Sequence, residues 1–333
     1  MGALAYYGFT IAIYTCLSAI QALGFNLQFG FAGIINLAYV VLVAVGAYST
    51  AIAAVAPAPH GGLTQYIGGF GWPFPWDMLF GIFCTLAFSA VLGGLAFKRL
   101  REDYLAVSMI VVGAGLLVLI NDDVPIFNGT SGMAGVPGPF QDQLGPEAYQ
   151  FVFLMMSAVS ALLIFLLFSR ITKSPFGRAL KAVREDSDAA ASLGKSPWRL
   201  KMSAFLLGGL AAGLSGSLLI LYIGAWNTSA WLPQESLIVL AAIIVGGRGN
   251  HGGAVLGTFV VIGVITQATK FIPSFGNAVL VASLQVVSIG LLILAFMWWR
   301  PQGLLPELKD QYLRVGIKKE LSDSGPALPR AVD

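Results

Sequence analysis

Charged residues are scarce in this sequence, where they occupy only 11% of the 333 positions. Soluble domains usually carry about a quarter charged residues, so the deficit argues against an ordinary soluble domain. Apolar residues make up 57% of the chain. They form several runs of about 20 residues, each long enough to cross a bilayer as a helix. The 40 glycines fit the same class, since small residues let membrane helices approach closely. The composition therefore predicts an all-α, polytopic helical membrane protein.

Cysteines and processing signals are also scarce or missing. The two cysteines, Cys16 and Cys84, both lie inside apolar runs, which argues against a disulfide framework. No basic stretch precedes the first apolar run and no clear cleavage site follows it, so we expect a retained span rather than a signal peptide. His251 has no Cys or acid at the spacing of a metal site, so we expect no metal there.

The apolar runs predict about eight full spans and one short or re-entrant segment. The short run, 235–247, is too brief for a full span, and such an element is tolerated where it lines a cavity or is buried in protein. We divide the chain into a membrane domain, 1–306, with a long loop at 171–201, and a polar tail, 307–333. The full spans are expected at 4–24, 31–56, 77–97, 103–121, 150–170, 202–224, 252–272 and 278–299.

The basic residues lie on one side of the predicted topology. When loop 171–201 is placed in the cytoplasm and 235–247 crosses, all of the 19 Lys and Arg residues except Lys270 fall on the cytoplasmic side. The positive-inside rule rarely gives so uneven a distribution by chance. We therefore expect the N-terminus outside and the C-terminus in the cytoplasm. We interpret the basic residues as topology signals rather than as a nucleic-acid surface.

One charged segment of the loop, 174–194, is predicted to be an amphipathic helix. Ser174 is a good N-cap, Pro175 falls at the first helical position and Gly194 is a natural stop. The basic residues suit a helix that lies on anionic lipid headgroups. The acidic half, EDSD, suits headgroups poorly, and it favours a docking helix for another protein.

The same segment resembles the cytoplasmic loop of bacterial branched-chain amino acid ABC-transporter permeases. Glu185, Ala189, Ala190 and Gly194 match that family's E-x-x-x-A-A-x-x-x-G coupling signature. The sequence departs from the family where INLAY replaces the usual Gly-His pair and where REDY replaces RGDY. Further stretches similar to conserved parts of the family are 22–48, 99–115, 244–257 and 300–307.

The resemblance implies the membrane half of an ATP-driven importer in the bacterial cytoplasmic (inner) membrane, with a fold similar to type II ABC importer permeases. The implied partners are a second homologous permease subunit, two ATP-binding cassette subunits, an extracytoplasmic solute-binding protein and membrane lipid. The chain has no G-x-x-x-x-G-K-[ST] motif, so ATP is expected on the partner subunits, and we expect a permease without enzyme activity or a cofactor of its own. The implied ATPase-coupling residues are Arg178, Arg184, Glu185 and Asp186 for polar docking, with Ala189, Ala190 and Gly194 for close approach.

A second unusual segment, 26–36, carries three amides and two glycines within an apolar stretch. Unpaired amides are costly in hydrocarbon, so these side chains are expected to face protein or a water-lined path. One interpretation is hydrogen bonding between helices with glycine packing, and the other is a broken helix whose freed backbone groups line the solute route. Glu235 is placed either in the membrane, with a function, or in an external loop. The predicted translocation residues are Asn26, Gln28, Gly30, Gly33, Asn36 and Glu235.

The predicted function is the import of branched-chain or other small hydrophobic amino acids. Urea, short amides and aromatic acids are alternatives within the same fold. A stand-alone secondary transporter or channel is an alternative from another class, but the full spans show almost none of the acidic residues that ion coupling usually needs. An intramembrane enzyme would need a paired His/Asp/Glu or Ser/Lys arrangement within a span, and the sequence has none.

Overall fold

The computed structural model describes residues 3–56, 69–99, 102–141, 143–266 and 278–307, and these are mostly helical, which confirms the all-α prediction. The first half contains α1 (Ala3–Asn26), the π-helix η1 (Leu27–Phe31), α2 (Tyr39–Ala54), α3 (Trp76–Arg99), α4 (Glu102–Asp122), α5 (Val124–Phe127), η2 (Gly129–Ser131) and β1 (Met133–Ala134). The second half contains α6 (Pro146–Lys173), α7 (Pro175–Glu185), α8 (Ser187–Ser192), α9 (Pro197–Ile223), β2 (Ala225–Trp226), η3 (Thr228–Trp231), α10 (Pro233–Gly246), α11 (His251–Thr258), η4 (Phe259–Thr266) and α12 (Ala278–Trp299).

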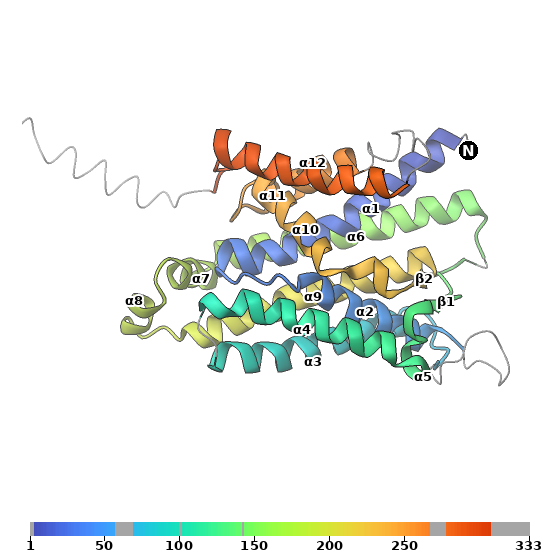
Figure 1. The fold of residues 1–333 in the computed structure, drawn as a ribbon, viewed down its shortest axis with the longest axis horizontal. Helices are drawn as coiled ribbons and strands as arrows, with labels where there is room; N and C mark the ends of the chain where they lie inside the picture. Colours follow the sequence, from blue (N-terminus) through green and yellow to red (C-terminus); the bar gives the residue numbers. More distant parts are fainter. Residues whose placement is uncertain (1–2, 57–68, 100–101, 142, 267–277, 308–333) are drawn as a thin grey trace, which may run out of the picture.

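The long helices lie roughly side by side, with α7 and α8 projecting at one end of the molecule (Figure 1). The opposite end carries α5 and the short antiparallel pair β1–β2. Among the described residues, six helical stretches are long and apolar enough to cross a membrane, and three shorter apolar helices accompany them. The chain is therefore a multi-pass helical membrane protein. Residues 308–333 of the predicted tail lie outside the described part of the chain.

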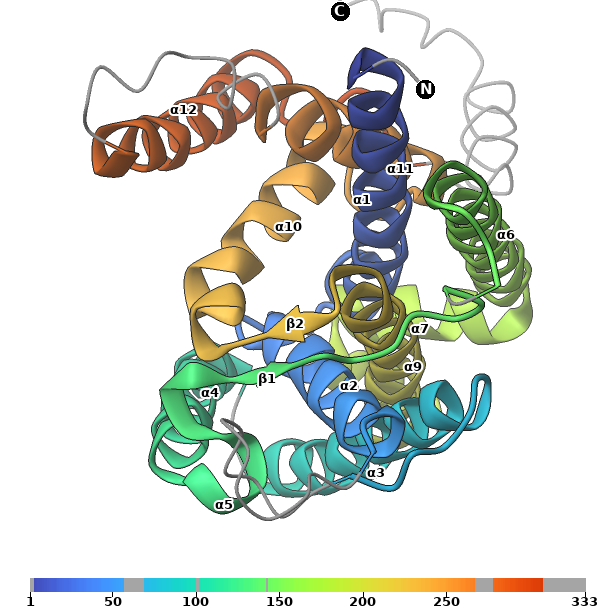
Figure 2. The ribbon, with the colours of Figure 1, turned by 90° about the vertical axis from the view of Figure 1, so that its right-hand side faces the viewer.

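Helix α9 lies in the interior of the bundle, where it packs against α1, α2 and α3 (Figure 2). Of its apolar window, 72% is buried inside the protein, against 22% for α3, so α9 faces other helices rather than lipid. Small residues permit this position. A Cβ atom on Gly216 would collide with the carbonyl oxygen of Val43 on α2. Glycine here allows the two backbones to touch.

The predicted span 31–56 is wrong at its start, because the chain is broken between Phe31 and Tyr39. The first helix continues as η1 to Phe31, and the regular helix α2 begins only at Tyr39. Gly33 has φ +72°, a conformation that non-glycine residues rarely adopt, and it ends the helical path. The Tyr39 hydroxyl donates to the carbonyl oxygen of Gly208, near the middle of α9, at 3.1 Å. Helix α2 thus begins deep inside the bundle.

Helix α10 corresponds to the short segment predicted at 235–247. It follows η3, and together they form an apolar stretch of 19 residues, long enough to cross a membrane. The stretch starts beside β2 and leads to the turn 247–250. This turn contacts the last residue of α1, just before η1, through a hydrogen bond from Gly249 N to Asn26 Oδ1. This segment therefore runs between the two ends of the molecule rather than returning to the side on which it began.

Candidate functional site

Helix α7 begins where the sequence predicts. Ser174 Oγ accepts a hydrogen bond from the backbone N–H of Phe176 at 3.2 Å, and Pro175 takes the first helical position. Leu180 and Val183 are buried against the bundle, while the polar face is open. The helix is thus amphipathic and is fixed to the membrane domain along one face.

The predicted single helix 174–194 is wrong in one respect, because the chain turns at Asp186. This residue has an extended backbone, and its Oδ1 accepts hydrogen bonds from the N–H groups of Asp188 and Ala189, both at 2.9 Å. Asp186 is therefore the N-cap of a second helix, α8, and its carboxylate is engaged within the loop. Gly194 has φ +77° just after α8, which confirms the predicted stop.

Arg184, at the end of α7, points inward and connects three segments. Its side chain is only 15% exposed. Nη1 donates to the carbonyl oxygen of Gly30 in η1, and Nη2 donates to Glu185 Oε1 at 2.6 Å and to Glu307 Oε2 at 3.1 Å. Burial alone would lower the pKa of the guanidinium, but the hydrogen bonds and charges of the two carboxylates outweigh it and raise the pKa of Arg184. The arginine stays charged and holds α7 to the broken helix.

Glu307 is the second centre of this arrangement. Its Oε1 lies 2.9 Å from Lys181 Nζ on α7, while its Oε2 receives Arg184. The segment 300–307 is held in turn by the end of α10, because Leu304 N donates to Val245 O at 2.8 Å and Leu305 N donates to Gly246 O at 2.9 Å. The segment 300–307, which we call the strap, thus lies across the end of α10. Its Glu307 carboxylate pairs with two cations of α7.

The turn between α10 and α11 completes the contact. Asn250 Nδ2 donates to Pro306 O at 3.1 Å, and Gly249 N donates to Asn26 Oδ1 at 3.0 Å. A Cβ atom on Gly249, where φ is +74°, would stand 2.9 Å from the carboxylate carbon of Glu307. A side chain at this position would therefore be strained by the backbone conformation and would displace the carboxylate of Glu307. We call this meeting of α7, η1, turn 247–250 and segment 300–307 the junction.

The three amides of the broken helix are buried and hydrogen-bonded within the protein. Gln28 Nε2 donates to Phe205 O at 3.0 Å, and Asn36 Nδ2 donates to Gln28 Oε1 at 3.1 Å. Asn26 accepts from the turn through Oδ1, as described above. Hydrogen bonding therefore accounts for the Gln28 and Asn36 side chains in this conformation, whereas Asn26 Nδ2 is buried without a hydrogen-bond partner in the described part of the chain. The place of all three amides on a solute path stays a prediction.

The six predicted translocation residues fall into two groups. Asn26, Gln28, Gly30, Gly33 and Asn36 all lie on or beside η1, next to the junction. Gly33 is held close to α7, since a Cβ atom there would stand 3.0 Å from the Cγ of Arg184. Glu235 lies apart, in the first turn of α10.

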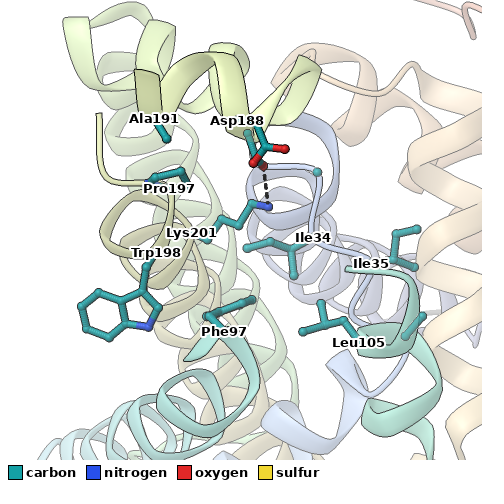
Figure 3. A pocket seen from close by; sticks show the side chains of 12 residues that line it. Ile34, Ile35, Phe97, Leu105, Asp188, Ala191, Pro197, Trp198 and Lys201 are labelled. Carbon is teal, nitrogen blue, oxygen red and sulfur yellow. Dashed lines mark hydrogen bonds between the residues drawn. The ribbon is translucent and has the colours of Figure 1, made fainter. Parts of the chain in front are cut away.

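A recess of about 710 Å³ opens beside the junction (Figure 3). Asp188 and Ala191 of α8 face it on one side, and Trp198 and Lys201 of α9 on another. Lys201 Nζ donates to Ser187 Oγ at 3.2 Å, which braces α8 against α9. The other lining groups are Gly33, Ile34, Ile35, Phe97, Leu105, Ala106 and Pro197. The recess thus has both charged and apolar walls.

The tip of α8 presents an apolar side chain to solvent. Leu193 is 82% exposed, and Ala189 is also exposed, whereas Ala190 is buried. Of the predicted polar coupling residues, Arg178, Glu185 and Asp186 are exposed, and Arg184 is turned into the junction.

Sequence reasoning missed Leu193, Lys181 and Glu307. Glu307 belongs to the stretch 300–307 that carried the family resemblance, but it was assigned to a polar tail. Its position just after an apolar stretch and a proline was the available signal. The pairing with Lys181 joins residues far apart in the chain, and no local pattern predicts such a pair.

The family model for the branched-chain amino acid transport system permease component matches residues 7–297. The high-affinity branched-chain amino acid transport system permease protein LivM of Escherichia coli is 28% identical over 325 residues, covering 90% of this chain and 70% of LivM. BraD of Pseudomonas aeruginosa, a permease protein of the same kind of system, is 26% identical over 87% of this chain and 92% of its own length. The probable permease protein LivM of Methanocaldococcus jannaschii is 27% identical over 63% of this chain and 61% of its own length. No solved structure matches the chain.

Proposed function

Because the chain belongs to the branched-chain amino acid transport system permease family, we propose that it imports branched-chain or other small hydrophobic amino acids as the permease subunit of an ATP-driven transporter. Its partners are a second homologous permease, two ATP-binding cassette subunits and an extracytoplasmic binding protein that delivers the solute. The N-terminus lies outside and the α7 end faces the cytoplasm, where the basic residues collect.

The junction is the observation that supports a coupled permease most directly. A docking loop that only anchored an ATPase would need no inward contact. Here Arg184 ties α7 to the carbonyl of Gly30 in the broken helix, and Glu307 ties both to the end of α10. A displacement of α7 therefore acts on two membrane segments at once. ATP binding and hydrolysis favour different arrangements of the ATPase pair, and these contacts transmit the difference.

The docking surface in this proposal is α8 with the exposed face of α7. Leu193 supplies an apolar anchor at the tip, and the exposed charges of Arg178 and Glu185 supply polar contacts. Mixed charge makes docking specific and breakable, as a cycle of ATP hydrolysis requires. The recess beside α8 leaves room for side chains of the ATPase.

The docking claim is tested by co-purification. The chain is expressed with the permease and ATPase subunits encoded beside it, and the amount of ATPase retained on a tagged permease is measured. Burial of a leucine side chain is worth about 1.5–3 kcal/mol, so Leu193→Ser should weaken ATPase binding by at least about tenfold. Ser192→Ala, at the neighbouring exposed position, is the control and should leave binding unchanged.

Two negative results have different meanings. If no ATPase binds the wild-type chain, the importer proposal itself fails. If the ATPase binds and Leu193→Ser retains it as well as wild type does, the proposal survives and the tip of α8 is not the docking point.

A further inference from the structure

A small cavity of about 170 Å³ lies away from the junction, between α1, α2, α9, α10 and η4. Tyr14, Ser18 and Gln21 line one side from a single face of α1, since they are spaced by four and three residues. Val43 belongs to the aliphatic wall, which α2, α9, α10 and η4 share. Glu235 is the acidic group in the lining.

This cavity reaches into the bundle from an open side at which Ala230 and Glu235 are exposed. Ser236, the neighbour of Glu235, accepts a hydrogen bond from the backbone N–H of Val40 at 3.1 Å. Val40 is in the first turn of α2, which begins beside Gly208 near the middle of α9. Glu235 therefore lies in the first turn of α10, close to the point where α2 begins.

The carboxylate of Glu235 makes no hydrogen bond or ion pair with any residue in the described part of the chain. Glu235 is itself exposed, so its carboxylate stands at the open side of the cavity, where a group of opposite charge can reach it. The basic residues of the junction, Lys181 and Arg184, are paired with Glu307 and lie near the opposite end of α10 from Glu235. The cavity therefore offers an acid with an open position beside an aliphatic wall.

We propose that this cavity is a transit site in which Glu235 receives the α-ammonium group of a small aliphatic amino acid. The inference rests on the proposed import function and adds the chemistry by which one cavity would bind the solute during import. A cavity of about 150 Å³ can hold benzene, so about 170 Å³ accommodates a branched aliphatic side chain with its polar end at Glu235. Ser18 and Gln21 lie within the same lining and present a hydroxyl and an amide toward the carboxylate end of the solute, and one Gln21 N–H donates to Ser215 Oγ at 3.0 Å.

The competing explanation is a purely structural acid. Carboxylates in the first turn of a helix favour the positive end of its dipole, and Glu235 occupies that position in α10. Glu147 likewise lies in the first turn of its helix, α6, and is exposed as Glu235 is, but it lines none of the described cavities. Glu147→Gln is therefore a matched control for Glu235→Gln.

The experiment measures ATP-driven uptake of L-leucine into proteoliposomes that contain the complete transporter with its binding protein. Glu235→Gln should lower uptake at least tenfold and leave assembly and thermal stability unchanged or higher, because it removes an unpaired charge. Glu147→Gln should leave uptake at the wild-type level. A Glu235→Gln transporter that imports leucine at the wild-type rate, or that loses uptake only in proportion to a lower melting temperature, overturns the inference. If the wild-type complex imports no amino acid, the proposed function fails instead.

A second measurement tests the ammonium directly. Trp226 also lines the cavity, so its fluorescence should respond to occupancy of the purified transporter. Isoamylamine, which has the branched chain and the ammonium, should change the emission, and 4-methylpentanoate, which lacks the ammonium, should not. The response should vanish in Trp226→Phe and in Glu235→Gln. An equal response to 4-methylpentanoate, or one that survives in Glu235→Gln, contradicts the assignment of the ammonium to Glu235.

Discussion

Neutralising Glu307 is the sharpest test of how α7 is joined to the membrane domain. Glu307→Gln keeps the size of the side chain and removes its charge. It thereby removes the ion pairs at 2.9 Å to Lys181 and at 3.1 Å to Arg184. The backbone hydrogen bonds of Leu304 and Leu305 remain, so segment 300–307 should stay in place. The substitution thus separates the charge of the strap from its position.

The size of the effect follows from exposure. The side chains of Lys181 and Glu307 are 22% and 25% exposed, between a surface pair and a buried one. Surface ion pairs contribute about 0–1 kcal/mol, and hydrogen bonds to charged groups contribute about 1.5–3 kcal/mol. Losing both pairs should therefore lower the coupling free energy between α7 and the membrane segments by roughly 1–3 kcal/mol. This corresponds to a change of about 5- to 150-fold in an equilibrium constant.

The assay is the ratio of L-leucine transported to ATP hydrolysed in proteoliposomes. Glu307→Gln should lower this ratio at least about fivefold while the ATPase still binds and hydrolyses ATP, because docking at α8 is untouched. A double-mutant cycle with Lys181→Met should show that the two changes are not additive, by about 0.5–1.5 kcal/mol in stability. Glu147→Gln, an exposed acid at the opposite end of α6, is the control. An intact complex with wild-type transport per ATP, or strictly additive effects, would refute the strap as a coupling element.

Two further predictions concern the backbone that supports these contacts. Gly249→Ala should lower the thermal stability of the permease, by about 1–3 kcal/mol in free energy, because the new Cβ strains φ +74° and meets the carboxylate of Glu307. Gly290→Ala, in open surroundings on α12, should be neutral or stabilising when melting curves are compared, and equal melting temperatures for both variants would contradict the close fit at Gly249. Asp186→Ala should remove the cap of α8, at a cost of about 1 kcal/mol. Hydrogen exchange in residues 187–192 should then rise, and unchanged exchange there would show that α8 does not depend on the cap.

The sequence predicted the membrane segments well and their interruptions only in part. Apolar runs determine where a helix can cross a bilayer, and the expected span 278–299 coincides with α12. A broken helix at 26–36 was one of two interpretations of the amide-rich segment, but a full span was still expected from residue 31, because residues 31–56 are apolar enough to read as one span. At Asp186 the local signal was present, since the residue is a strong N-cap, but the helical pattern on both sides concealed it.

The junction was beyond sequence reasoning for a different reason. Arg184 was expected to face an ATPase, because charge in a loop normally points to water or to a partner. Its inward direction depends on Gly30 and Glu307, which lie 154 and 123 positions away along the chain. Periodicity reports only neighbours within a few turns, so contacts of this range become visible only in three dimensions.

The distance in sequence between Arg184 and Glu307 has a consequence for biosynthesis. The glutamate emerges from the ribosome 123 residues after the arginine, a delay of about 6–25 s at typical rates of synthesis. During that interval the guanidinium has Gly30 and Glu185 to bond, but it lacks the strap that joins it to α10. The contact that unites loop and membrane domain therefore closes only after α12 has been made. A nascent permease can thread most of its helices into the bilayer before its loop becomes rigid enough to be driven by an ATPase.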